Sequence, residues 1–224
     1  TKTAVVFALG YTTNVSMQAA VTRESKSYRD IVQEDYIDSY KNLTYKGIMW
    51  LKFASEYCPQ AQYVLKVDDD IFVNIFNLVG HLGRMAKHKS HPPKSVICLV
   101  WYGMVVNRDV NNKWYVSKEE YANDTFPPYC SGSAYIITRD LIRPMYEQSF
   151  KIKFMWVDDW YITGALIEAL HVEHTSIASL YVLAAAEIRE RLVDGYALFG
   201  HVGSMNQRAA LWKDVLKQKG MEVA

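Results

Sequence analysis

The chain has 224 residues, of which 50% are hydrophobic and 13% aromatic, and its formal net charge is +1 at pH 7. The near-zero charge argues against a general binder of nucleic acid or of membrane surfaces, because either role needs a basic stripe. No apolar run approaches the roughly 18 residues of a membrane span, so neither a span nor a signal peptide is expected in this sequence. No linker interrupts the chain, and we expect a single domain over residues 1–224.

Strand and helix signals alternate along the first half of the chain. Short apolar, β-branched runs predict strands, and apolar residues three or four positions apart predict helices. Asn74 is a good N-cap and Pro59 a good helix stop. The elements predicted from these signals are a buried strand at 4–9, a polar helix at 14–27, a short strand at 30–36, a buried helix at 44–57, a buried strand at 62–65 and a helix at 75–86.

The second half is less regular, and its aromatic residues gather in irregular stretches. The Asn111-Asn112 turn signal predicts an antiparallel hairpin, and Ser204 with Gln207 forms a capping box. Residues expected to point inward from the last helix are Met205, Ala209, Trp212, Val215 and Leu216. The predicted elements are a strand at 95–100, a hairpin within 101–121, a tight loop at 126–133, a strand at 134–137, a short helix after Thr138, a helix at 158–170, a strand at 196–202 and a final helix from 205. This order favours an α/β domain with a mixed central sheet flanked by helices.

Three consecutive carboxylates, Asp68, Asp69 and Asp70, follow the strand predicted at 62–65. Like charges repel, so this grouping costs free energy unless a cation is shared among them. Hard oxygen ligands suit Mn²⁺ or Mg²⁺, and such ions keep open positions for substrate phosphates. A solvated acidic turn is the alternative interpretation. The position at the carboxyl end of a strand, where open α/β sheets bind ligands, favours the metal.

The cysteines and glycosylation sequons bear on the compartment. Three cysteines without CxxC spacing argue against a zinc site, and leave open one bridge plus a free thiol, a partner elsewhere, or no bridge. These are Cys58, Cys98 and Cys130. Three Asn-x-Ser/Thr sequons point toward a secretory compartment, and they begin at Asn14, Asn42 and Asn123.

Several segments, taken in order, carry a resemblance to a known family. They are Phe7–Gly10, Tyr28–Lys46, Asp68–Asn74, Lys113–Ser117, Pro127–Gly132 and Asp158–Gly164. As a set they resemble the β-1,3-galactosyltransferase and β-1,3-N-acetylglucosaminyltransferase family, to which fringe-type enzymes are related. The resemblance implies a GT-A fold. It also implies inverting transfer of galactose or N-acetylglucosamine from a UDP-sugar to a glycan on glycoprotein or glycolipid, in the Golgi lumen.

The resemblance also implies roles for particular residues. Asp70, together with Asp68, is expected to hold Mn²⁺ (or Mg²⁺) on the diphosphate, and His201 is a further candidate ligand, with a satisfied core histidine as the alternative. Asp159 matches the Asp of the family's Glu-Asp-Val-Tyr-x-Gly motif and is the expected base for the acceptor hydroxyl. Helix capping is the alternative for one of the two aspartates there. The remaining candidates are Tyr40, Lys46 and Asp69 for the donor, and Asp158, Trp160, Tyr129 and Gly132 for the acceptor.

The sequence departs from the family pattern at three places. An Arg- and Trp-containing segment that precedes the first strand in the family is not present, Asp158 and Trp160 replace the family's Glu and Val, and Ser131-Gly132-Ser133 is bulkier than its counterpart. We expect the chain to be a fragment of a type II membrane protein whose anchor lies outside it. A catalytically inactive relative, acting as a carbohydrate-binding or chaperone-like protein, is the alternative function, and a metal-dependent phosphohydrolase ranks third.

Overall fold

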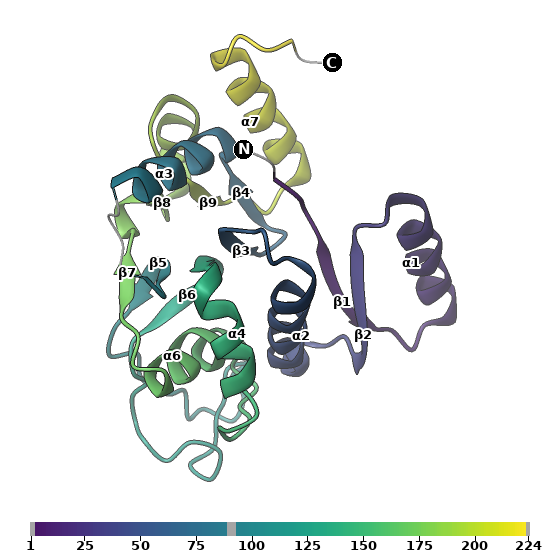
Figure 1. Ribbon diagram of the computed structural model, residues 1–224, viewed down its shortest axis with the longest axis vertical. Helices are drawn as coiled ribbons and strands as arrows, with labels where there is room; N and C mark the ends of the chain where they lie inside the picture. The colour runs from purple at the N-terminus through teal and green to yellow at the C-terminus, as the bar shows by residue number, and fades with distance from the viewer. Residues whose placement is uncertain (1–2, 89–92, 223–224) are drawn as a thin grey trace. The chain divides into compact units, whose positions relative to one another are not determined.

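Figure 1 presents the computed structural model, which describes residues 3–88 and 93–222. The chain forms two compact units, each assembled from three segments. Unit 1 comprises Thr1–Val64, Trp101–Tyr129 and Thr138–Glu173, and unit 2 comprises Leu65–Val100, Cys130–Ile137 and His174–Ala224. Because the chain passes repeatedly from one unit to the other, no single linker separates them, and a single domain over 1–224 stays a prediction.

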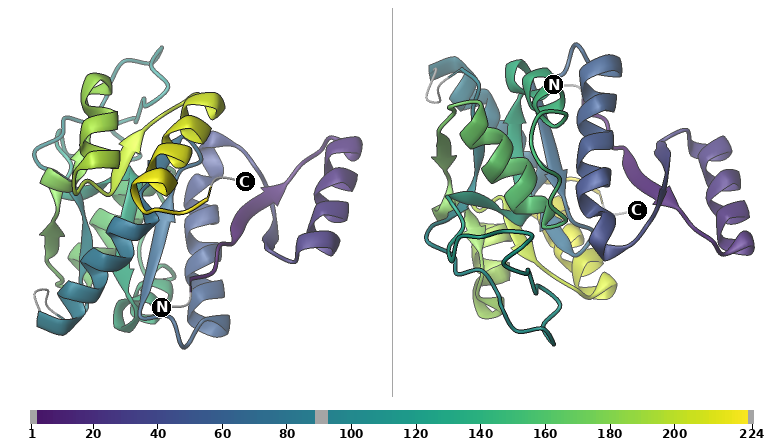
Figure 2. Two further views of the ribbon diagram at one scale, coloured as in Figure 1. Left: turned by 90° about the horizontal axis from the view of Figure 1, so that it is seen from above. Right: turned by 90° about the horizontal axis from the view of Figure 1, so that it is seen from below.

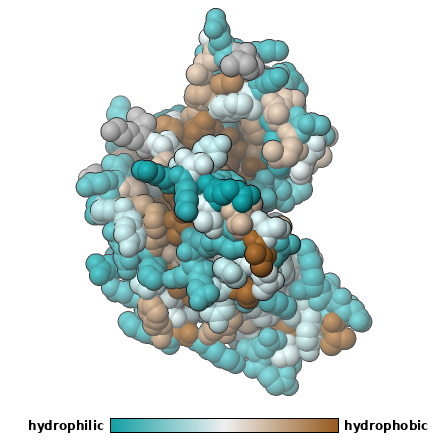
Figure 3. Space-filling model, turned by 90° about the vertical axis from the view of Figure 1, so that its right-hand side faces the viewer, coloured by the Kyte–Doolittle hydropathy of each residue, from teal (hydrophilic) through white to brown (hydrophobic). Residues whose placement is uncertain are grey.

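Unit 1 begins with a strand, a helix and a second strand. Strands β1 (Phe7–Tyr11) and β2 (Ile31–Ile37) pair in parallel and are joined by α1 (Val15–Tyr28), which Figure 2 shows beside them. The side that carries α1 is covered largely by hydrophilic side chains (Figure 3). Helix α2 (Leu43–Tyr57) follows. The strand, polar helix, strand and long helix predicted for this region are confirmed.

Strand β1 is not the buried strand that its apolar run predicted. Phe7 is 52% exposed, and Gly10 is the only buried residue of the strand. The reason is that β1 has one strand neighbour, β2, so this two-stranded sheet covers little of it. Gly10 is packed so closely that a Cβ added there would lie 2.6 Å from Cε2 of Tyr36.

The rest of unit 1 consists of an irregular loop and two helical segments. Helix α4 spans Arg139–Gln148. The second segment runs through α5 (Asp158–Trp160), a π-helical turn (Tyr161–Ala165) and α6 (Leu166–Ala169). The helix predicted at 158–170 is therefore confirmed, with a widened middle that the apolar spacing did not indicate.

The hairpin predicted within 101–121 is wrong. Beyond Trp101, the last residue of β5, this stretch has a single isolated bridge, from Val105 to Thr125. Arg108 takes the place of a strand ladder, because its guanidinium donates hydrogen bonds of 2.6 to 2.8 Å to three backbone carbonyls, those of Val116, Tyr121 and Asn123. A side chain that satisfies backbone acceptors in this way stabilises an irregular loop without a partner strand.

Unit 2 contains two sheets, and a few end residues of their strands are counted in unit 1. The larger has the strand order β3 (Tyr63–Val67), β6 (Tyr129–Thr138), β5 (Val96–Trp101) and β7 (His174–Ser176), with β5 and β7 parallel. In the smaller, β9 (Phe199–His201) pairs antiparallel with β4 (Ile71–Val73) and parallel with β8 (Tyr181–Val182). The helices of unit 2 are α3 (Ile75–His88) and α7 (Met205–Gln218). Short helical turns elsewhere in the chain are Tyr40–Asn42, Ala178–Leu180, Ala185–Glu187 and Glu190–Asp194.

Strand β6 is longer than predicted and is covalently joined to β5. Residues 129–133, predicted as part of a loop, are its first half, in which the Ser131 and Ser133 hydroxyls, on the same face, lie 2.8 Å apart. The disulfide Cys98–Cys130 links the two neighbouring strands, and both cysteines are fully buried. Cys58 is a free thiol. Of the alternatives that the sequence left open, one bridge plus a free thiol is confirmed.

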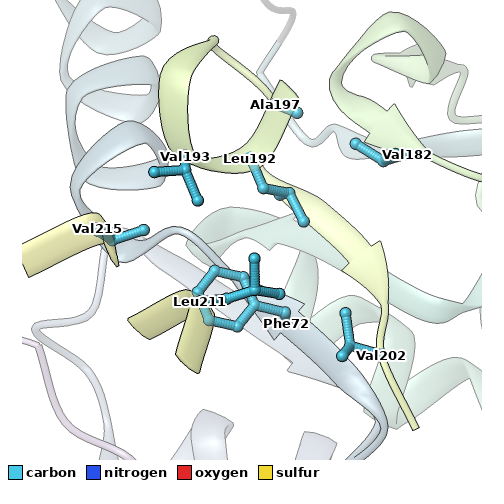
Figure 4. Packing of buried hydrophobic residues seen from close by; sticks show 8 residues of the cluster. All are labelled: Phe72, Val182, Leu192, Val193, Ala197, Val202, Leu211 and Val215. Carbon is cyan, nitrogen blue, oxygen red and sulfur yellow. The ribbon is translucent and has the colours of Figure 1, made fainter. Parts of the chain in front are cut away.

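A hydrophobic cluster fills the interior of unit 2 beside the smaller sheet (Figure 4). Phe72 of β4 packs among residues of β8, of α7 and of the turn at 190–197, and against Val202, which directly follows β9. Its other members are Val182, Leu192, Val193, Ala197, Val202, Leu211 and Val215. This packing holds β4 and β9 in place, and these two strands carry the polar residues described below.

Several predictions for unit 2 need correction. The strand predicted at 196–202 covers only Phe199–His201, and Tyr196 is 83% exposed. In α7, Met205, Ala209 and Trp212 are exposed, because Leu211 and Val215 form the buried face. Trp212 instead stacks on Phe76 at the surface. The strand predicted as buried at 62–65 corresponds to β3, which is only partly buried.

Asn74 fixes the start of α3 and is completely buried. Its side chain accepts a hydrogen bond from the Asn77 amide and donates one to the Leu192 carbonyl, at 3.1 and 2.7 Å. We expect Asn74→Ala to lower the free energy of unfolding by about 2 kcal/mol, since it removes the cap and leaves a buried carbonyl unpaired. Urea denaturation measures this, with Asn206→Ala on the exposed side of α7 as the control. A value equal to that of the control would contradict the structural role.

Candidate active-site residues in the two units

The first group of candidate residues surrounds the acidic turn Asp68–Asp70, which joins β3 to β4 in unit 2. The Asp68 amide donates to the Ser133 carbonyl of β6 at 3.0 Å, and the Val202 amide donates to the Asp70 carbonyl at 2.8 Å. The backbone of Asp68 is therefore hydrogen-bonded to the larger sheet of unit 2, and the backbone of Asp70 is hydrogen-bonded to the residue that follows β9 of the smaller sheet. Asp69, between them, is exposed.

Asp70 and His201 lie together at one end of the smaller sheet. Strand pairing sets Ile71 opposite His201, and Nε2 of His201 lies 3.0 Å from Oδ2 of Asp70. Both side chains are about half exposed or more, so the pair is open to ligands. The satisfied core histidine that the apolar strand suggested as an alternative is therefore wrong for His201, which is exposed.

Asp68 has a different partner. The ammonium of Lys66 contacts Oδ1 of Asp68 and the carbonyl oxygen of Gly132, and it lies 5.7 Å from the centre of the Tyr135 ring. No group of three His, Cys, Asp or Glu side chains is arranged to hold a metal ion within the described parts of the chain, 3–88 and 93–222. A carboxylate oxygen and an imidazole nitrogen are donors that Mn²⁺ accepts, so Asp70 and His201 fit as two of its ligands. The set of Asp68, Asp70 and His201 stays a prediction.

The second group of candidate residues lies in unit 1, at the start of α5. Asp159 Oδ1 accepts a hydrogen bond from the Trp160 amide at 2.8 Å, and the Asp159 carbonyl accepts one from the Thr163 hydroxyl. Asp158 and Asp159 both belong to the first turn, where the helix dipole stabilises negative charge. Both are partly exposed, so a carboxylate is held in place and remains accessible at this turn.

Aromatic rings pack behind Asp159. Trp160 is 8% exposed and lies 5.0 and 5.3 Å from the Tyr121 and Phe126 rings, measured between centroids. Tyr129 packs edge-on against Phe126. Burial, and to a smaller extent the negative charge of Asp159, raises the pKa of Tyr129 to about 12. Tyr129 therefore keeps its proton at neutral pH, and its phenol lies near enough to sense the Asp159 charge.

The donor candidates Tyr40 and Lys46 also belong to unit 1. Lys46 forms an ion pair of 3.0 Å with Asp38, whose other carboxylate oxygen accepts a 2.8 Å hydrogen bond from the Gly10 amide. The Tyr40 hydroxyl accepts a hydrogen bond from the Trp114 indole at 2.7 Å. The structure thus brings together two of the segments that carry the family resemblance, 28–46 and 113–117.

Two residues of these groups were not among the candidates from the sequence. Lys66 lies two positions before Asp68. A lysine so close to three consecutive carboxylates is the sequence signal that could have identified it. Asp38 lies eight residues before Lys46, but its contact with Gly10 spans 28 residues and no local pattern indicates it. Candidate residues divide between the units: Asp68, Asp69, Asp70, Gly132 and His201 belong to unit 2, and Tyr40, Lys46, Tyr129, Asp158, Asp159 and Trp160 belong to unit 1.

The described residues thus form an α/β chain with an acidic turn after a strand and a pair of carboxylates at a helix start. Residues 1–178 match the protein family described as Galactosyltransferase. This match covers most of the sequence, and the chain belongs to that family. It includes the acidic turn and Asp159, whereas His201 lies beyond it.

The individual relatives agree with the family match. The chain is 31% identical over 223 residues to β-1,3-galactosyltransferase 1 of Homo sapiens and of Mus musculus. It is 34% identical over 175 residues to β-1,3-galactosyltransferase 5 of Mus musculus. These alignments cover 97% and 75% of this chain, but the chain spans only 65% and 56% of the relatives' length. Among the described helices, none combines the length and the apolar character that crossing a membrane requires.

Proposed function

We propose that this chain is the catalytic part of a β-1,3-galactosyltransferase with a GT-A fold, which transfers galactose from UDP-galactose to a glycan on glycoprotein or glycolipid. The family match over residues 1–178 carries the proposal. The names of the relatives favour galactose over N-acetylglucosamine as the sugar. The disulfide Cys98–Cys130 supports an oxidising compartment such as the Golgi lumen.

The donor side of the proposed reaction belongs to unit 2. Asp70 and His201 would hold Mn²⁺ or Mg²⁺, and when bound this ion would supply positive charge that neutralises the departing diphosphate. Asp69 is exposed at the middle of the turn, where its carboxylate can accept hydrogen bonds from the donor. Lys46 and Tyr40 of unit 1 stay candidates for the nucleotide, with Asp38 holding the Lys46 ammonium.

The acceptor side rests on Asp159. The acceptor hydroxyl loses its proton to the Asp159 carboxylate, its oxygen forms a bond to the anomeric carbon of galactose, and the bond from that carbon to the diphosphate oxygen breaks with UDP leaving. Attack from the face opposite UDP inverts the anomeric centre, as in an inverting glycosidase with a sugar hydroxyl in place of water. Tyr129 remains a neutral phenol beside this base, and so it can donate a hydrogen bond to the acceptor or to Asp159. Asp158 and Gly132 stay candidates for acceptor contacts.

Trp160 is buried and has a structural role. Its ring packs within the group of Tyr121, Phe126 and Tyr129, and a Cβ added at Gly164 would lie 3.0 Å from it. Its indole nitrogen is buried without a hydrogen-bond partner. Trp160 stays a candidate for acceptor contacts.

A transfer assay tests the proposal. UDP-galactose and other UDP-sugars are offered with acceptors that end in galactose, N-acetylgalactosamine or N-acetylglucosamine, with Mn²⁺ or with EDTA. We expect Mn²⁺-dependent product from UDP-galactose, and we expect Asp70→Asn to reduce it by about 10²-fold or more because the variant loses a metal ligand. Transfer from UDP-N-acetylglucosamine alone would correct the donor. UDP–Mn²⁺ binding without product from any pair would favour the inactive, carbohydrate-binding relative.

A further inference from the structure

We propose that Lys66 is a positioning residue that holds Asp68 on the β3–β6 side of the acidic turn, so that the metal ion is left to Asp70 and His201. This inference deepens the proposed function and rests on its metal site. It assigns different tasks to the outer two carboxylates of a triplet that the sequence presents as equivalent.

The position of Lys66 supports this role. Its side chain is 19% exposed, less than half the exposure of the Asp68 side chain, which is 47%. A lysine so enclosed needs partners for its charge, and it has two, the Asp68 carboxylate and the Gly132 carbonyl. One of these partners is in the turn and the other is in β6. The ammonium therefore fastens the Asp68 side chain to the same strand that already binds the Asp68 amide.

The opposite end of the turn is fastened elsewhere. The Asp70 carbonyl is bonded to the Val202 amide, and the Asp70 carboxylate meets His201, the last residue of β9. The side chains of Asp68 and Asp70 are thus directed to partners on two different sheets of unit 2. This division explains why the described residues contain a pair of potential ligands at this turn and no group of three.

The charge of Lys66 has a second consequence. Three carboxylates and one ammonium leave two formal negative charges at the turn, which a divalent cation would neutralise. Removing Lys66 would release Asp68 and would also remove a positive charge that repels the metal ion. We expect the loss of this repulsion to tighten metal binding by a factor of about ten. A lysine that merely stabilised the fold would, when replaced, weaken the metal site instead.

Binding of Mn²⁺ alone, measured by calorimetry, separates these possibilities. We expect Lys66→Met to tighten Mn²⁺ binding about tenfold, and Asp68→Asn to weaken it by no more than about tenfold, because that variant loses one negative charge near the metal ion but no ligand. Asp70→Asn should abolish binding. Lys52→Met, which breaks a surface ion pair with Glu34 in unit 1, is the matched control and should bind like the wild type.

Weaker binding by Lys66→Met, or a loss in Asp68→Asn as large as that in Asp70→Asn, would overturn the inference while leaving the metal site intact. If Lys66→Met does not fold, Asp68→Asn decides the question by the same criterion. Absence of Mn²⁺ binding by the wild type, with galactose transfer that persists in EDTA, would overturn the metal-dependent part of the proposed function and the inference with it. The two failures are therefore distinguishable.

Discussion

Asp159→Asn is expected to reduce the rate of galactose transfer by about 10²- to 10⁴-fold, the range that positioned general bases contribute. Asparagine has nearly the same shape as aspartate and its side-chain oxygen can still accept the hydrogen bond from the Trp160 amide, so the helix start should persist. The variant loses the carboxylate that takes the proton from the acceptor hydroxyl. Steady-state kinetics with the best acceptor measures the loss in kcat.

Two comparisons give this result its meaning. UDP binding in the presence of Mn²⁺ should be unchanged in Asp159→Asn, since the donor residues proposed in unit 2 are untouched. Asp140→Asn is the matched control, because Asp140 also lies in the first turn of a helix of unit 1 and has no proposed role in the reaction. A variant of Asp159 that keeps most of its turnover would contradict its assignment as the base.

Removal of the Cys98–Cys130 disulfide is expected to lower the free energy of unfolding by about 3 to 4 kcal/mol, the loop-closure entropy for a separation of 32 residues. Both cysteines lie in the interior of the larger sheet, where β5 has five buried residues in succession, so the bridge connects parts of unit 2 that unfold together. Urea denaturation of the double variant Cys98→Ala/Cys130→Ala measures the effect. Cys58→Ala removes the free thiol and serves as the control. Equal denaturation midpoints for the double variant and the control would refute the prediction.

The sequence predicted elements well where the apolar spacing and the caps agreed. Helix α3 begins after Asn74 because that side chain caps it, and α7 begins after Ser204, whose hydroxyl accepts a bond from the Gln207 amide. Prediction failed where a distant group replaced local rules. Arg108 organises the loop after β5 by donating hydrogen bonds to carbonyls up to 15 residues away. The polar residues Ser131 and Ser133 belong to a strand because β6 pairs with β3 on one side and β5 on the other.

The candidate site shows the same division. The acidic turn was recognisable because three carboxylates follow a strand, and the structure brings His201 to Asp70 as the resemblance implied. The contacts of Lys66 and Asp38 were not predictable. Lys66 contacts Gly132, which is 66 positions away in the sequence, and Asp38 contacts Gly10, which is 28 positions away. Sequence spacing indicates which residues share an element, but it does not indicate which strands become neighbours. The roles of Asp159 and of the metal ligands stay predictions until they are measured.

The interleaving of the two units has a consequence for biosynthesis. Unit 1 needs a segment that ends at Glu173, and unit 2 needs His174–Ala224, so neither unit can be completed while the ribosome is still making the first 170 or so residues. Strand β4 in particular emerges more than a hundred residues before β9, its partner in the sheet. For much of its synthesis, the nascent chain therefore exposes β4 and Phe72, because the later residues that pack against them have not yet been made. Chaperones that bind exposed apolar segments should act on this interval, and fragments that stop before β9 should aggregate.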